Sequence, residues 1–151
     1  LVNQLITTEG QDIEFFEGGK GYTNSVVERV IKDWETEEIK SSIRSSCSIN
    51  DLISNYISSG EQLDWLHLDV EGYDADLLRA LKQPLPPFII FENHPWHHKE
   101  EMEYNEQQKK RIQTYLTDNG YDIVYGMVTQ GTDVSCLATL PHGRANSPTK
   151  K

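Results

Sequence analysis

Apolar runs and amphipathic stretches alternate regularly in the second half of the chain. The apolar runs predict strands at 63–70, 88–93 and 121–127. The stretches between these runs have apolar residues at helical spacing, and they predict helices at 72–83 and 103–119. Strands that alternate with such helices are typical of a parallel β-sheet with right-handed crossovers. The last apolar run, 133–140, follows a short loop and is therefore expected to return antiparallel as a closing hairpin.

The first half of the chain carries shorter patterns. Residues 1–17 predict two short strands. Residues 25–34 have apolar positions at helical spacing and predict a helix, and apolar and polar residues alternate over 38–48, as in an edge strand. The stretch 48–51 is a variant of the capping box, and it predicts a short helix that stops before Gly60. We expect these elements to precede the regular α/β part.

Composition and charge narrow the class of protein. The 151 residues suffice for one domain, which we assign to 1–140, followed by a polar, disordered tail at 141–151. The net charge of −10, from 24 acidic and 14 basic residues, repels nucleic acid and anionic membranes, so we expect neither as a partner. Two cysteines without metal-site spacing, and no signal peptide or membrane-length apolar run, favour a cytoplasmic protein.

Acidic residues and a histidine follow two of the predicted strands. Asp69 and Glu71 come at the end of the run 63–70, and Glu92 and His94 at the end of the next run. In open α/β sheets, ligands bind beyond the carboxyl ends of the strands, and neighbouring strands are only about 5 Å apart. A carboxylate that ends an apolar strand is unfavourable unless it meets a partner, a cation or water. We therefore expect Asp69, Glu92 and His94 to converge on one small molecule, with His94 best suited to titrate near neutral pH.

Several residues near these strand ends have simpler interpretations. Glu71, Asp74 and Asp76 stand at a helix N-terminus, where the helix dipole stabilises each acid by roughly 0.3–1 kcal/mol. We favour this interpretation for Asp74 and Asp76. Gly72 permits a tight turn from strand to helix, and His67, inside a predicted strand, is expected in the core or behind the site.

Three segments within residues 48–94 resemble a known family. SINDLISNY, LDWLHLDVEGYDADLLRALKQ and PPFIIFENH are similar to the FkbM-type family of S-adenosylmethionine-dependent methyltransferases, whose signature has the form D-x-x-K-I-D-V-E-G-x-E. The most specific match is D-V-E-G at 69–72. The resemblance implies an α/β fold with a Rossmann-like class I methyltransferase sheet, mostly parallel with an antiparallel final strand.

The chain departs from the family pattern in three places. His67 stands where Lys is usual, and Asp74 where Glu is usual. The family's cofactor-binding half, with G-A-N-x-G after an apolar strand and a following strand that ends in an acid and Pro, has no counterpart here. Those elements are expected before Leu1. The resemblance therefore implies the C-terminal portion of a methyltransferase domain that lacks its first strands.

The resemblance implies transfer of a methyl group from S-adenosylmethionine to a hydroxyl of a sugar or small secondary metabolite. Asp69 and His94 would act as base or orienting group, and Glu71 and Glu92 would bind substrate hydroxyls or shape the pocket. Asp69 and Gly72 would also border the cofactor.

Two alternatives remain open. In the first, Mg²⁺ or Mn²⁺ assists the reaction and is bound by the same four side chains, but their spacing is not diagnostic, so we assign no metal site. In the second, the chain is a non-catalytic α/β module that binds a glycan or a partner protein. The missing cofactor loop is the main support for this second alternative.

Overall fold

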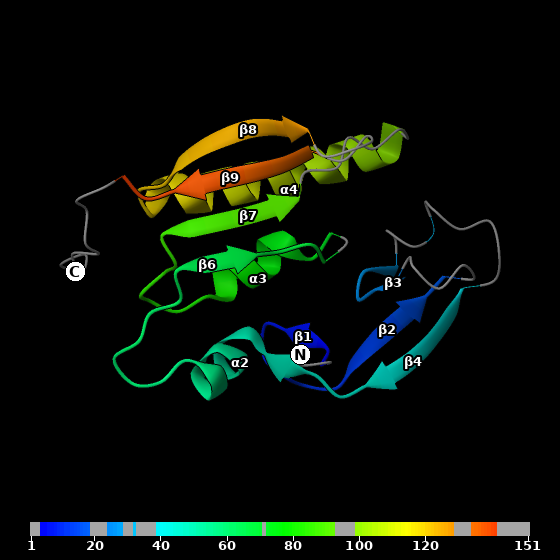
Figure 1. Cartoon of the computed structure of the whole chain (residues 1–151). Coiled ribbons are helices and arrows are strands. Elements are labelled where there is room, and N and C mark those ends of the chain that lie inside the picture. The colour runs from blue at the N-terminus through cyan, green and yellow to red at the C-terminus, as the bar shows by residue number, and fades with distance from the viewer. Residues whose placement is uncertain are drawn as a thin grey trace.

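Three sheets and three helices make up the described part of the protein (Figure 1). The computed structural model describes residues 4–18, 24–28, 32, 39–70, 72–92, 99–128 and 134–141. Half of the predicted helix at 25–34 and all but residue 141 of the predicted tail at 141–151 lie outside these ranges. Of the described half, Ser25 belongs to a strand and not to a helix, whereas residues 28 and 32 are helical. None of the helices within the described ranges combines the length and the apolar character needed to cross a membrane.

The main sheet has four strands in the order β6-β7-β9-β8. Strand β6 (Trp65–His67) pairs in parallel with β7 (Phe88–Glu92), as the alternation of strands and helices predicts. Strand β9 (Val134–Thr139) forms the expected antiparallel hairpin with β8 (Asp122–Val128), and it also inserts antiparallel beside β7. Three strands therefore run in one direction and only the final strand is reversed. The predicted mixed α/β architecture is confirmed.

Helices α3 (Asp74–Ala80) and α4 (Lys99–Asp118) lie against one face of the main sheet (Figure 1). Every second residue of the strands points toward these helices, so the strands and helices share one core. Its best-buried members are Leu77, Leu78, Leu85, Ile89, Phe91, Leu116, Cys136 and Ala138. Cys47 is half-buried and Cys136 is buried, and neither forms a disulfide.

The opposite face of the main sheet carries two rows of side chains in register across the four strands. The rows are Trp65–Phe88–Thr139–Asp122 and His67–Ile90–Leu137–Val124. This face is open to solvent, since Trp65 is 54% exposed and Val124 is 53% exposed. The ring centroids of Trp65 and Phe88 lie 6.2 Å apart. His67 shares this face and is exposed, so its predicted position in the core is wrong: the strand alternation turns it away from the helices.

The N-terminal part forms two small sheets. Strand β1 (Ile6–Thr7) pairs in parallel with β5 (Cys47–Ser48), whereas β2 (Ile13–Glu17) lies antiparallel between β3 (Asn24–Ser25) and β4 (Lys40–Arg44). The two strands predicted within residues 1–17 therefore exist, and they belong to different sheets. Strand β4 is an edge strand, as predicted.

The turn between β1 and β2 packs closely against β5. Gly10 has a φ of +69°, and a Cβ at this position would lie 2.5 Å from the Ser48 backbone nitrogen. The Thr7 hydroxyl lies 2.7 Å from the Ser46 hydroxyl and accepts a hydrogen bond from the Gly10 N–H. Only glycine fits this contact, because both the conformation and the space exclude a side chain.

Helix α2 (Ile49–Tyr56) begins at the predicted cap. The Ser48 hydroxyl accepts a hydrogen bond from the Asp51 N–H at 3.0 Å and donates one to the Asp51 carboxylate at 2.7 Å. The Asn50 side chain then links α2 to the end of α3, because it donates to the Ala80 carbonyl and accepts from the Lys82 N–H. Helix α2 therefore fixes the C-terminal end of α3.

Candidate functional site

The candidate site begins at the turn between β6 and α3. The ladder to β7 continues one residue past β6, where the Leu68 N–H donates to the Ile90 carbonyl at 2.9 Å. The chain then turns, and the Tyr73 N–H donates to the Val70 carbonyl at 3.3 Å. Gly72 has a φ of +87° within this turn. Its predicted role, to permit a tight strand-to-helix turn, is confirmed.

A cavity of about 240 Å³ opens beside this turn. From the turn it is lined by Asp69, Val70 and Tyr73. The rest of its wall comes from the N-terminal strands and the segments that flank them: Gln4, Leu5, Ile6, Phe15, Asn24, Ser25 and Val26. The Asp69 side chain is exposed, so its carboxylate is accessible from this cavity. The cavity therefore lies beyond the carboxyl end of β6, where α/β sheets place their ligands.

Two hydroxyl groups join the two sides of the cavity. The Thr8 Oγ1 lies 3.3 Å from the Tyr73 hydroxyl oxygen, across 65 positions of sequence. Neither residue stands out in the sequence, because Tyr73 occupies a variable position of the D-x-x-K-I-D-V-E-G-x-E signature and Thr8 follows a strand of two residues. The only available signal for Tyr73 was its place next to Gly72.

The two acidic residues in the first turn of α3 are held within the protein by burial or by an ion pair. Asp74 and Asp76 lie in the first turn of this helix, which confirms their predicted position. Asp74 is buried at 5% exposure. The Asp76 carboxylate accepts a hydrogen bond from the Arg111 guanidinium of α4 at 2.6 Å. Asp76 therefore links the two helices, which the helix-dipole interpretation did not anticipate.

The remaining predicted site residues are only partly described. Glu71 and His94 lie outside the described residues, as does the side chain of Glu92. The backbone of Glu92 ends β7 opposite Ser135 of β9. Because β6 and β7 are parallel neighbours, their carboxyl ends lie side by side, which is the condition for Asp69 and Glu92 to converge. Their convergence with His94 stays a prediction.

The same residues include the side chains of the metal-assisted alternative. Within the described ranges, no group of three or more His, Cys, Asp or Glu side chains is placed to hold a metal ion. Of the four side chains proposed as ligands in the metal-assisted alternative, those of Glu71, Glu92 and His94 are not described. The metal-assisted alternative therefore stays a prediction. The polar residues that line the cavity are Asp69, Tyr73, Gln4, Asn24 and Ser25. The turn at Gly72 lies beside it, and the Thr8 hydroxyl contacts the Tyr73 hydroxyl.

An α/β domain with a small cavity beyond the carboxyl end of a parallel strand has the arrangement of the ligand-binding α/β proteins. Comparison with protein families identifies which of them. The model of the FkbM methyltransferase domain matches residues 4–123. The chain therefore belongs to the FkbM methyltransferase family, and this membership identifies it as a methyltransferase in the general sense. Comparison with curated proteins and with solved structures gives no significant match.

Proposed function

We propose that this chain contributes one side of a site that transfers a methyl group from S-adenosylmethionine to a hydroxyl oxygen of a sugar or small secondary metabolite. The observation that carries the proposal is the position of Asp69. It is an exposed carboxylate on the wall of the cavity beyond β6, within the D-V-E-G segment of a member of the FkbM family.

The chemistry of the cavity suits part of this cofactor. A carboxylate accepts hydrogen bonds from hydroxyl and ammonium groups, and S-adenosylmethionine carries both. The volume of about 240 Å³ is smaller than the roughly 300–1,000 Å³ typical of complete ligand pockets. The described wall therefore fits a portion of the cofactor, which Asp69 and the turn at Gly72 would hold.

The cofactor supplies an electrophilic methyl group, and the residues of this chain act on the acceptor. The acceptor oxygen would bond to the methyl carbon as the bond from that carbon to the sulfonium sulfur breaks, so that the sulfur leaves as the neutral thioether of the demethylated cofactor. The proton of the acceptor hydroxyl would pass to a base, for which Asp69 and His94 are the candidates. Alignment of the two reacting groups supplies much of the rate, and a positioned base adds about a hundredfold or more. Glu71 and Glu92 would bind other hydroxyls of the acceptor.

A transfer assay with paired variants tests this proposal. The chain is incubated with S-adenosylmethionine and a panel of sugar and polyol acceptors, and the demethylated cofactor is measured. We expect acceptor-dependent turnover that Asp69→Asn lowers by about a hundredfold. Asp64→Asn is the matched control, since Asp64 is exposed and its backbone carbonyl, not its side chain, bonds to Phe88. If both variants lower turnover equally, Asp69 has no specific role.

A second candidate function rests on the open face of the main sheet. Trp65 and Phe88 form an exposed aromatic pair there, and exposed aromatic patches mark binding surfaces. A non-catalytic module that binds a glycan or a partner protein would use this face. Retained binding of such a ligand by Asp69→Asn, together with its loss in Trp65→Ser, would favour this second function over methyl transfer.

A further inference from the structure

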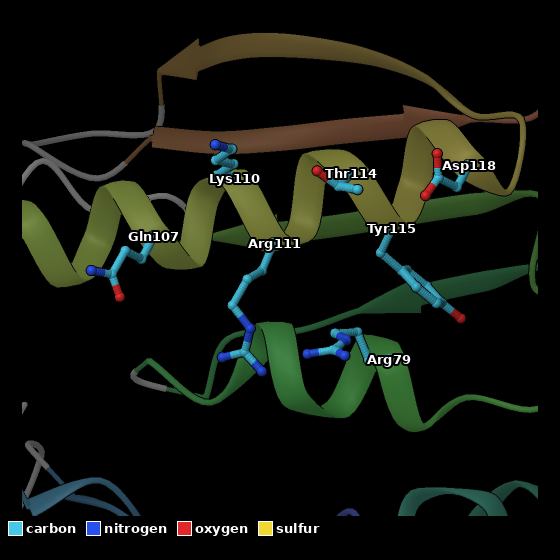
Figure 2. A pocket seen from close by; sticks show the side chains of 7 residues that line it. All are labelled: Arg79, Gln107, Lys110, Arg111, Thr114, Tyr115 and Asp118. Atoms are coloured by element: carbon cyan, nitrogen blue, oxygen red, sulfur yellow. The ribbon is translucent and has the colours of Figure 1, made fainter.

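A second, larger cavity lies between α3 and α4, on the outer side of the helix pair (Figure 2). Its volume is about 620 Å³, within the range of small-molecule sites. Six of its seven lining residues come from α4, and Arg79 comes from the last turn of α3. Tyr73, which lines the cavity beside β6, precedes α3, so the two cavities adjoin opposite ends of this helix.

Three cationic side chains line this groove. Arg79 rises from α3, and Arg111 reaches down from α4, so that their guanidinium groups point toward each other (Figure 2). Lys110 is the next residue to Arg111 along α4, but its side chain points away from α3, on the opposite edge of α4 from Arg111 (Figure 2). The chain as a whole carries a net charge of −10, so the sign of the charge on these side chains is opposite to that of the whole chain.

The cations of the groove have few anionic partners. The Arg111 guanidinium donates to the Asp76 carboxylate at 2.6 Å and to the Gln108 side-chain oxygen at 2.8 Å. These bonds occupy two of its five N–H groups. Among the described residues, Arg79 and Lys110 have no ion-pair partner. Among the seven lining residues Asp118 carries the one carboxylate, and it lies at the far end of α4, beyond Tyr115 (Figure 2).

The arrangement of charges is complementary to a compact dianion. Two guanidinium groups that face each other repel, and the single carboxylate bonded to Arg111, that of Asp76, leaves a net positive charge where the two arginines meet. A phosphate group carries a charge of about −1.5 to −2 and three strong acceptor oxygens, which match the forked donors of arginine. A single carboxylate ligand would leave more of these donors unpaired.

The rest of the groove offers contacts for an organic group. The Tyr115 ring is half-buried beside Arg79, and burial raises the pKa of its hydroxyl, which therefore stays a neutral donor at physiological pH. Gln107 and Thr114 add neutral polar groups along α4. An aromatic wall next to arginines accommodates a flat ring or a sugar beside its phosphate.

We propose that the groove between α3 and α4 binds a small molecule that carries a phosphate or diphosphate group. Arg79 and Arg111 donate hydrogen bonds to the phosphate oxygens, and Tyr115 contacts the organic part. This site is separate from the proposed methyl-transfer site, so the two proposals succeed or fail independently.

Calorimetric titration of the 151-residue chain at low ionic strength tests this proposal, with inorganic pyrophosphate and uridine diphosphate as the probes. We expect saturable binding of both, tighter for the nucleotide because its ring and sugar contact Tyr115. Arg79→Gln should weaken binding by about tenfold or more, since it removes charge-assisted hydrogen bonds.

The matched control is Arg44→Gln. Arg44 lies on β4, outside the groove, and its replacement changes the net charge by the same amount. Binding to this variant should stay within about twofold of the unchanged chain, because distant exposed charges are screened. Circular dichroism confirms that each variant is folded. Absence of saturable binding by the folded chain, or equal weakening in Arg44→Gln and Arg79→Gln, would overturn the proposal.

Discussion

The Thr8 hydroxyl lies 3.3 Å from the Tyr73 hydroxyl and joins the segment after β1 to the start of α3. Both segments border the same cavity, since Ile6 lines it from β1 and Tyr73 lines it from the turn after Gly72. The N-terminal strands are therefore part of the candidate site and not an appendage of the main sheet. The cavity keeps its shape only while these two segments stay together.

Tyr73→Phe removes this hydroxyl contact and leaves the ring in place. We expect the free energy of unfolding to fall by about 0.5–1.5 kcal/mol, the usual contribution of one hydrogen bond. Urea unfolding measures the change. Tyr56→Phe is the control, because Tyr56 is 64% exposed and its hydroxyl should contribute nothing measurable. An equal loss in both variants would mean that the contact between Thr8 and Tyr73 has no role in stability.

Asp76→Asn separates the two roles of Arg111. The ion pair between Asp76 and Arg111 has side chains that are each about one-third exposed, so its loss should cost no more than about 1 kcal/mol. At the same time it frees the Arg111 guanidinium for a phosphate. Pyrophosphate binding in the groove should therefore become tighter, by a few-fold, in this slightly less stable variant. Weaker binding by the folded variant would contradict the arrangement of charges described above.

The two faces of the main sheet should respond differently to substitution. Leu78 is fully buried between α3 and the sheet, so Leu78→Ala should lower the free energy of unfolding by about 2–5 kcal/mol. Trp65→Ser, at a position 54% exposed on the open face, should change it by less than about 1 kcal/mol. Chemical unfolding of both variants makes the comparison. A large loss in Trp65→Ser would mean that another part of the chain covers this face.

Stability should fall in alkaline solution because of Tyr121. Burial, and secondarily the nearby Tyr115, raises the pKa of the Tyr121 phenol above its ordinary value of 10.0. Above pH 10 the unfolded chain therefore releases this proton while the folded chain retains it. The free energy of unfolding should then fall as the pH rises, by up to about 1.4 kcal/mol per pH unit.

Urea unfolding of the chain and of Tyr121→Phe, at about pH 8 and about pH 11, measures the effect. The variant loses the hydrogen bond from this hydroxyl to the Pro86 carbonyl, so it should be less stable at the lower pH. Its stability should nevertheless decline less between the two pH values. An identical decline in both proteins would show that other groups dominate the alkaline transition.

Hydrophobic periodicity predicted the regular half of the fold well. Every strand and helix predicted between residues 63 and 140 is present, although β6 is shorter than predicted because the chain leaves the ladder at Leu68 to form the turn at Gly72. The insertion of β9 beside β7 was not predictable, since a hairpin pattern specifies only one of a strand's two neighbours. The pairing of β1 with β5 was not predictable either, because a strand of two residues is too short to show a hydrophobic periodicity.

The candidate site was predictable only where a local motif marks it. Asp69 and Gly72 stand in the most specific segment of the family signature, and the structure places both at the turn beside the cavity. The contact of Tyr73 with Thr8 and the ion pair of Asp76 with Arg111 depend on how distant segments pack, which spacing along the chain does not reveal. The prediction that His67 lies in the core was wrong for a related reason, because apolar neighbours in sequence do not tell which face of a strand is covered.

Calorimetric titration of S-adenosylmethionine, and of its demethylated product, into the 151-residue chain tests the proposed function most directly. The proposal predicts saturable binding of both compounds, weakened by about tenfold in Asp69→Asn and unchanged within about twofold in Asp64→Asn. Absence of binding by a chain that circular dichroism shows to be folded would contradict it. The non-catalytic module, with Trp65 and Phe88 on its open face, would then be the better explanation of this protein.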